Sequence, residues 1–199
     1  EKATAKLLEV NGQLQFSQGE FERALSNWQA AAQKYQTLED DDNYLKNLIN
    51  KVRALQNLGL YSRAIKIVTK IEENLDEKPN NIFKHQTLLT IGSLLQGKGR
   101  LQESEAILQR SLTVANELNS PDASARSFIN LGNTSRLQGQ LVEALNLYQL
   151  AIEATANTQI ELEAKLNQLN LLVATEQIEE ATTLIPQIEA DLNQLPCDR

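Results

Sequence analysis

The sequence contains no methionine, one cysteine, four prolines and eight glycines, and only 5% of its residues are aromatic. The single cysteine, Cys197, excludes an intrachain disulfide. So few prolines and glycines leave long stretches without a breaker, which favours helices over strands. No apolar run is long enough to cross a bilayer, and no signal peptide is present in the residues shown. Because the chain begins at Glu1 and lacks methionine, we expect a fragment of a longer protein. The sequence does not determine the cellular compartment. The cytoplasm is the default expectation, and export is possible if a signal peptide was removed.

The sequence also has no excess of basic residues. The net charge is −7 and the isoelectric point is near 4.9, which disfavours binding to nucleic acid or to an anionic membrane surface. The only histidine, His85, cannot build a histidine-rich metal site, and we expect it to be solvent-exposed at the start of a helix. Cys197 has no cysteine partner and is expected at a frayed terminus. Without a nucleophile–base pair, the sequence predicts neither an enzyme nor a bound metal or cofactor.

What the sequence does contain is an internal repeat of 40 residues. Glycine recurs at Gly19, Gly59, Gly99 and Gly139. A small residue follows each glycine by five positions, and a large residue follows by nine: Ala24, Ala64, Ser104 and Ala144, then Trp28, Val68, Leu108 and Tyr148. A fifth copy is offset by only 37 residues and has Glu176 in place of the glycine. Repeats of this length indicate stacked supersecondary units.

Each copy has the pattern of two amphipathic helices. In the fourth copy Phe128, Leu131, Gly132 and Ser135 share one helical face, and a second apolar stripe begins at Leu141. The glycine between them suits a left-handed helix terminus where the chain reverses. Small residues such as Gly132 would let two helices approach closely while Tyr148 fills the space beside them. A single helix pair cannot bury both apolar faces, so we predict a stack of pairs.

This pattern resembles the tetratricopeptide repeat, whose usual length is 34 residues. The resemblance covers essentially the whole chain and implies an all-α, right-handed α-solenoid of five helix-turn-helix pairs. It predicts one superhelix over residues 1–199, with repeats at about 5–40, 45–80, 85–120, 125–158 and 162–195. Val52 departs from the pattern, since the family usually has glycine there. The segments LQFSQGEFERALSNWQAA and LNQLNLLVATEQIEEATTLIPQIEADLNQLP are also similar to the N-terminal repeat regions of cyanobacterial CHAT-domain proteins.

The family resemblance implies a protein-interaction module that binds a peptide or partner segment in a concave groove. The first helix of each pair lines that groove in the family. Carried onto this chain, the groove residues are Arg53, Arg126, Ile129, Asn133, Arg136, Leu166, Asn170 and Val173. Their arginines would select acidic groups on the ligand, and the apolar members would hold its aliphatic side chains. The alternative for each polar residue is an ordinary solvated surface position.

A second functional interpretation follows from the CHAT-domain similarity. The chain could be an intramolecular regulatory arm that docks and gates a caspase-like effector domain downstream.

The last predicted helix also carries more apolar residues than one buried stripe needs, and these are Leu184, Ile185, Ile188, Leu192 and Leu195. We therefore expect either that the array continues or that this helix supports self-association, with Pro186 bending it or breaking one of its hydrogen bonds.

Overall fold

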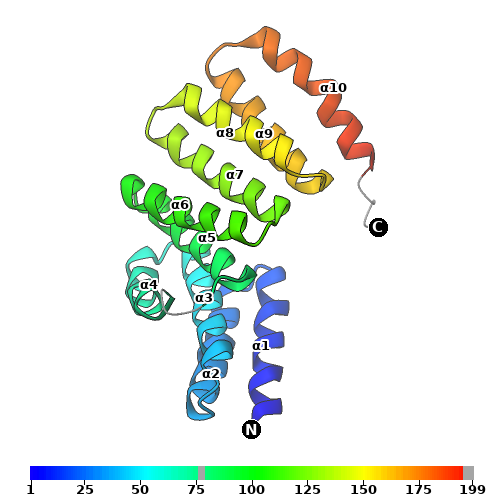
Figure 1. The fold of residues 1–199 in the computed structure, drawn as a ribbon. Helices are drawn as coiled ribbons and strands as arrows, with labels where there is room; N and C mark the ends of the chain where they lie inside the picture. Colours follow the sequence, from blue (N-terminus) through cyan, green and yellow to red (C-terminus); the bar gives the residue numbers. More distant parts are fainter. Residues whose placement is uncertain (76–78, 195–199) are drawn as a thin grey trace. The chain divides into compact units, whose positions relative to one another are not determined.

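The computed structural model describes residues 1–75 and 79–194, and these residues form ten α-helices and no strand (Figure 1). The helices are α1 (Lys2–Ser17), α2 (Phe21–Thr37), α3 (Asp41–Asn57), α4 (Tyr61–Leu75), α5 (Ile82–Gly97), α6 (Leu101–Glu117), α7 (Pro121–Leu137), α8 (Leu141–Ala154), α9 (Thr158–Ala174) and α10 (Ile178–Gln194). The predicted all-α helical-repeat fold is thus confirmed. Cys197 and Leu195 lie outside the described residues.

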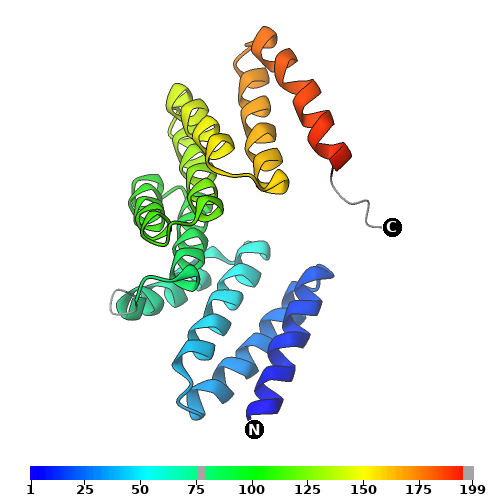
Figure 2. The ribbon, with the colours of Figure 1, turned by 45° about the vertical axis from the view of Figure 1, so that its right-hand side comes forward.

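The chain forms two compact units, Glu1–Pro79 and Asn80–Arg199. The first unit contains α1 to α4, and the second contains α5 to α10. Within each unit, consecutive helices pack side by side in antiparallel pairs (Figure 2). None of the helices in residues 1–75 and 79–194 is long and apolar enough to cross a membrane.

The glycines of the repeat end the first helix of each pair in the first four copies. Gly19, Gly59, Gly99 and Gly139 have φ angles of 77°, 70°, 72° and 80°, a left-handed region that glycine enters without steric penalty. The backbone N–H of Gly139 donates to Arg136 O (3.1 Å), and that of Gln140 donates to Ser135 O (2.8 Å). In the fifth copy Glu176 adopts the same conformation, with φ 58°, although it carries a side chain.

A second set of glycines lies where the two helices of a pair come closest. A Cβ atom added to Gly132 would lie 2.6 Å from Tyr148 Cε1, and one added to Gly12 would lie 2.5 Å from Trp28 Nε1. Both aromatic side chains are fully buried. In the second copy Val52 replaces the glycine, and its partner is correspondingly smaller, Val68. The small–large pairing predicted from the repeat is therefore present in the packing.

The fifth copy breaks this pairing. Leu169 occupies the position of the small residue, and Ile185 occupies the position of the large one. Leu169 is half-buried, while 43% of the Ile185 surface is exposed. Of the apolar residues singled out on this helix, Leu184 and Ile188 are buried, whereas Ile185 is exposed.

α10 continues through Pro186 and leaves apolar side chains on its outer face. Ile178, Ile185 and Leu192 are 58%, 43% and 52% exposed and recur every seven residues. Residues seven apart lie close to one face of an α-helix. This exposed stripe is consistent with the predicted self-association, which stays a prediction.

His85 is buried, with 1% of its surface exposed, so the expected solvent exposure is wrong. Its Nε2 lies 2.9 Å from Ala123 O and 3.1 Å from Ser127 Oγ on α7. The Ser111 hydroxyl on α6 donates to His85 O (3.3 Å) and lies 3.2 Å from Ser127 Oγ. His85 lies in the first turn of α5 as expected, but residues of α6 and α7 cover this end of the helix. The contacts of its ring connect α5 to α7.

Candidate functional site

The predicted groove residues of the fourth and fifth copies lie on α7 and α9, the first helices of their pairs. Arg136 and Asn170 line one hollow of about 320 Å³, together with Leu141, Asn167, Leu171, Ala174 and Thr175. We call this hollow the α7–α9 seat. Arg136 comes from the last turn of α7, and Asn170 comes from the C-terminal half of α9. The structure therefore places together two residues that are 34 positions apart in the sequence.

A hydrogen bond on α7 orients the predicted groove residue Asn133, which does not itself line the α7–α9 seat. The Tyr148 hydroxyl on α8 donates to Asn133 Oδ1 (2.8 Å), which fixes the orientation of the Asn133 amide. Burial raises the pKa of Tyr148 above its usual value, and the nearby Arg136 guanidinium only partly offsets that rise. Tyr148 thus stays neutral at physiological pH, and the positive charge of Arg136 is exposed beside it.

Three apolar side chains are exposed next in sequence to residues that line the seat. Leu166 and Val173 on α9 are 42% and 53% exposed, and Leu137 at the end of α7 is 48% exposed. None of the three lines the hollow itself. Their place in the predicted groove stays a prediction.

Ile129 is a correction to the predicted groove. Only 1% of its surface is exposed, and it packs in a core cluster with Ala125, Ala151, Ile160 and Ala164. It therefore binds α7 to α8 and α9 and cannot contact a ligand. The position that Ile129 occupies in the repeat faces the neighbouring pair, because α7 and α9 pack directly on each other.

The other two predicted arginines, Arg53 and Arg126, do not line the seat. Arg53 belongs to the first unit, where its guanidinium carbon lies 5.1 Å from the centre of the Phe16 ring. Such cation–π contact positions the side chain while leaving its charge accessible. Arg126 is exposed on α7 near His85, and its charge contributes to a lowered pKa of that histidine. Neither arginine lines the α7–α9 seat.

Sequence reasoning missed Asn167, Leu141 and Thr175, all of which line the seat. Asn167 precedes Asn170 by three residues on α9, so helical spacing alone places the two amides on one face. Thr175 directly follows α9 and Leu141 is the first residue of α8, so repeat positions within the first helix could not identify them. Asn167 could have been predicted, and the other two could not.

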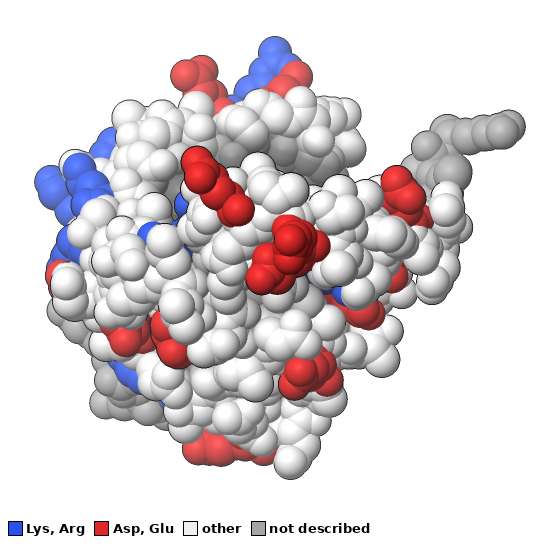
Figure 3. Space-filling model, turned by 90° about the horizontal axis from the view of Figure 1, so that it is seen from above, with Lys and Arg blue, Asp and Glu red and all other residues white. Residues whose placement is uncertain are grey.

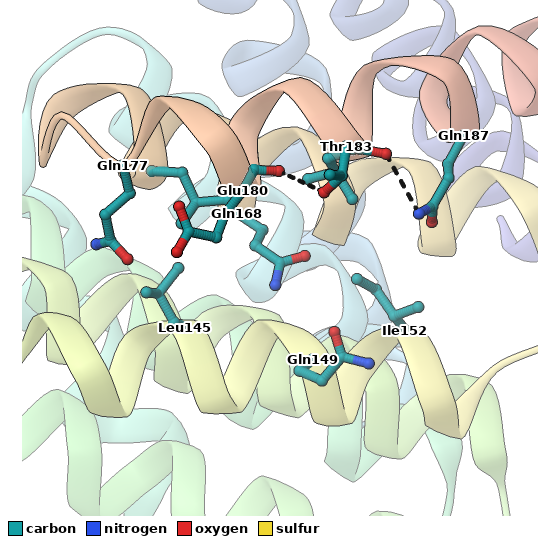
Figure 4. Close-up of a pocket in the computed structure, with 10 residues that line it drawn as sticks. Leu145, Gln149, Ile152, Gln168, Gln177, Glu180, Thr183 and Gln187 are labelled. Atoms are coloured by element: carbon teal, nitrogen blue, oxygen red, sulfur yellow. Dashed lines mark hydrogen bonds between the residues drawn. The ribbon is translucent and has the colours of Figure 1, made fainter.

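A second hollow of about 430 Å³ lies between α8, α9 and α10. Figure 4 shows Leu145, Gln149 and Ile152 on α8 facing Glu180, Thr183 and Gln187 on α10. Gln168 on α9 also lines it, and its Oε1 atom is buried without a hydrogen-bond partner. Its lining combines aliphatic side chains, amides, one threonine and one carboxylate, and within the described residues it includes no Lys or Arg.

Charged side chains are spread unevenly over the surface. Figure 3 shows Asp and Glu scattered across the face in view, with Lys and Arg gathered toward its margins. Basic residues are the minority in this chain, with 19 Lys and Arg against 26 Asp and Glu. A cluster of basic side chains without acidic neighbours is therefore unusual for this composition.

Comparison with known proteins connects this geometry to a family. The tetratricopeptide repeat model matches residues 84–157. No curated protein matches the sequence. A solved Podosopora anserina protein with nearly identical TPR-like repeats is 14% identical, with a TM-score of 0.78 over 98% of this chain and 99% of that one.

Two further solved structures have the same fold. BtubC (BKLC) from P. vanneervenii is 14% identical, with a TM-score of 0.80 over 100% of this chain and 84% of that one. The Rap conjugation gene regulator of plasmid pLS20, solved in complex with the Phr* peptide, is 20% identical, with a TM-score of 0.74 over 89% of this chain and 50% of that one. The residues matched by the family model are thus tetratricopeptide repeats, and the described chain has the tetratricopeptide repeat fold.

Proposed function

We propose that this chain is a non-enzymatic protein-interaction module that binds a peptide or partner segment on the surface formed by α7 and α9. The observation that carries the proposal is the α7–α9 seat, where Arg136, Asn167 and Asn170 converge beside exposed leucine and valine. Amide side chains both donate and accept, so they can pair with the backbone of an extended peptide. Arg136 adds a fixed charge that can bind a carboxylate through two parallel hydrogen bonds.

The size of the seat suits a segment of a partner rather than a large globular surface. A hollow of about 320 Å³ holds a few side chains, and the exposed leucine and valine extend it along α9. The structural neighbour solved with the Phr* peptide has the same fold, which supports a peptide as the class of ligand. No comparison supports the gating of a caspase-like domain, so we do not propose it.

The direct test is affinity capture from the source cell followed by mass spectrometry. The bait is the wild-type chain, with Arg136→Glu as the groove variant and Arg23→Glu as the matched control. The Arg23 side chain on α2 is 71% exposed and forms an ion pair with Glu20, three residues before it. We expect Arg136→Glu to lose the partners that the control retains, since a carboxylate would repel the acidic ligand.

Circular dichroism should show an unchanged helical content in both variants, because both arginines are exposed. Arg136→Gln separates charge from hydrogen bonding at the same position. Partners that survive Arg136→Glu and Arg136→Gln but disappear with Arg23→Glu would place the binding surface elsewhere.

A further inference from the structure

A groove in the first unit contains a cluster of cations that the acidic composition does not lead one to expect. Two adjoining hollows of about 380 and 360 Å³ lie between α2 and α4, over α3. They share Gln29, Lys51, Lys66 and Ile67, so they form one continuous depression, which we call the α2–α4 groove. Arg63 lines one end and Lys70 lines the other, and among the residues that the structure describes no Asp or Glu lines either hollow.

The cations follow helical spacing along one wall. Arg63, Lys66 and Lys70 lie at positions i, i+3 and i+7 of α4, so they share one face of that helix. At a rise of 1.5 Å per residue, the row is about 10 Å long. Within the described residues, no ion pair is formed by Arg63 or Lys66, whereas Lys70 already has a partner. Arg63 and Lys66 are both exposed and can therefore contact a bound anion.

The opposite wall is a row of amides. Gln29, Gln33 and Gln36 lie at positions i, i+4 and i+7 of α2 and are all exposed. Gln29 accepts a hydrogen bond from Lys51, whose side chain rises from α3 at the floor of the groove. Lys51 is 9% exposed. Burial lowers its pKa most, and the nearby charges of Arg63 and Lys70 lower it further. The floor between the two walls is apolar, with Leu48 and Leu55 from α3.

The hollow between α8 and α10 provides an internal comparison. Copies two and five are offset by 117 residues (Ala64 to Ala181), and the two hollows occupy equivalent places in their repeats. The residues equivalent to the four cations Lys51, Arg63, Lys66 and Lys70 are, in order, Gln168, Glu180, Thr183 and Gln187. The fifth copy therefore forms such a hollow without Lys or Arg among its described residues, so the repeat architecture does not require the cations of the second copy.

We propose that the α2–α4 groove is a second binding surface, which takes an extended acidic peptide segment of a protein partner. Arg63 and Lys66 bind carboxylates of alternate residues, because side chains two apart on an extended chain are about 6–7 Å apart and point the same way. The glutamine row on α2 pairs with the backbone of the segment, and the apolar floor contacts its Cβ atoms. A row of about 10 Å accommodates three or four extended residues. A long polyanion such as nucleic acid is disfavoured, since the chain as a whole carries a charge of −7.

The test measures fluorescence anisotropy of a short labelled peptide with aspartate at alternate positions. The same peptide with asparagine in place of aspartate, a phosphoserine version and inorganic phosphate are separate arms. We expect the aspartate peptide to bind, the asparagine peptide to bind at least about tenfold more weakly, and Arg63→Glu/Lys66→Glu to lower the affinity by about tenfold. Raising the salt concentration should weaken binding similarly, because screening at 1 M shortens the Debye length to about 3 Å.

Two control variants separate this surface from the proposed peptide seat. Lys98→Glu reverses an exposed charge in the second unit, and Arg136→Glu disables the α7–α9 seat. Lys98→Glu should bind the aspartate peptide as the wild type does, and the binding that Arg136→Glu retains should still be lowered by Arg63→Glu/Lys66→Glu. All variants should keep their helical circular dichroism. The proposal is overturned if the aspartate peptide does not bind, or if Arg136→Glu abolishes its binding while Arg63→Glu/Lys66→Glu does not. It is also overturned if only the phosphoserine peptide and inorganic phosphate bind, since a small oxyanion site would then explain the cations.

Discussion

At the scale of single residues, packing within each helix pair depends on a match between one small and one large side chain. The Cβ position of Gly132 lies 2.6 Å from Tyr148, whereas Val52 and Val68 share the same space in the second copy. A helix pair therefore tolerates either combination, provided that the total volume is conserved. The exposed Ile185 opposite Leu169 shows the consequence of two large residues.

Gly132→Val should destabilise the second unit by about 1–3 kcal/mol, because the added methyl groups overlap the Tyr148 ring. Adding Tyr148→Val to the same chain reproduces the natural pairing of the second copy and should recover part of that loss. Urea unfolding of wild type, both single variants and the double variant measures the coupling between the sites. Strictly additive losses would show that the two side chains do not share the space assigned to them.

Glu176→Gly should stabilise the chain by about 1 kcal/mol. Glu176 has φ 58° at the turn after α9, a conformation that costs a residue with a side chain about 1–2 kcal/mol relative to glycine. Glycine occupies this position after the first helix of the other four repeats, whereas Glu39 and Asn119 adopt positive φ at the turns after α2 and α6. Thermal unfolding should show a higher midpoint for the variant, while Gly139→Ala, at φ 80°, should lower it. A lower midpoint for Glu176→Gly would mean that its side chain stabilises the turn through another contact.

At the scale of helices, buried polar groups determine which neighbours pack together. Lys165 on α9 is 5% exposed and donates to Asp191 Oδ2 on α10 (2.7 Å), while Glu161 Oε1 lies 2.7 Å from the same ammonium. These hydrogen bonds raise the pKa of Lys165, although burial alone would lower it. Lys165 therefore remains charged and links the last two helices.

Asp191→Ala should destabilise the α9–α10 pair by about 3–5 kcal/mol, because it leaves Lys165 buried with only Glu161 as a partner. Lys165→Met/Asp191→Leu removes both charges and should be considerably more stable than the single variant. Hydrogen exchange of α10 amides measures the local effect. Equal protection in wild type and Asp191→Ala would contradict the role assigned to this pair.

Acidification should weaken the contact between α5 and α7 through His85. Burial lowers the pKa of His85 below its usual value of about 6.5, the hydrogen bond to Ala123 O opposes that shift, and Arg126 adds to it. The folded state thus binds fewer protons than the unfolded state, so the contribution of His85 is present above pH ~6.5 and is lost as the pH falls. Its Nδ1 atom is buried and has no hydrogen-bond partner, so an N–H formed there on protonation would lack an acceptor.

We expect the free energy of unfolding of the second unit to decrease between pH 7 and pH ~5, and His85→Gln to remove most of that decrease. The Glu9 carboxylate titrates in a lower range, since its bonds to Lys6 and Lys46 outweigh burial and lower its pKa below its usual value. An identical pH dependence in wild type and His85→Gln would assign the effect to another group.

The sequence allowed much of the fold to be predicted, because period and turn glycines are local signals. The glycine spacing correctly located the turns, and the pairing of Gly132 with Tyr148 followed from helical geometry. Burial of His85 and Ile129 could not be read in the same way, because both depend on which neighbouring helix covers a given face. The α2–α4 cations were also missed, since Lys51 on α3 joins Arg63 and Lys66 on α4 only when these helices are packed together.

At the scale of the whole molecule, two compact units each present a different surface chemistry. The second unit has the α7–α9 seat with amides, one arginine and exposed aliphatic side chains. The first unit has the α2–α4 groove, where cations face a row of glutamines. A chain with two such surfaces could engage two segments of one partner, and simultaneous binding of linked segments raises the overall affinity without any new contact.

The central claim is that the partner binds along α7 and α9, and site-specific photo-crosslinking tests it most directly. Val173 on α9 is 53% exposed and directly precedes Ala174, which lines the seat, whereas Leu150 on α8 is 44% exposed and neither lines the seat nor adjoins a lining residue. Benzoylphenylalanine at each position, irradiated with the captured partner, reports which surface the partner contacts. We predict efficient cross-linking from position 173 that Arg136→Glu abolishes, and little from position 150. Cross-linking from position 150 alone, unaffected by Arg136→Glu, would contradict the account.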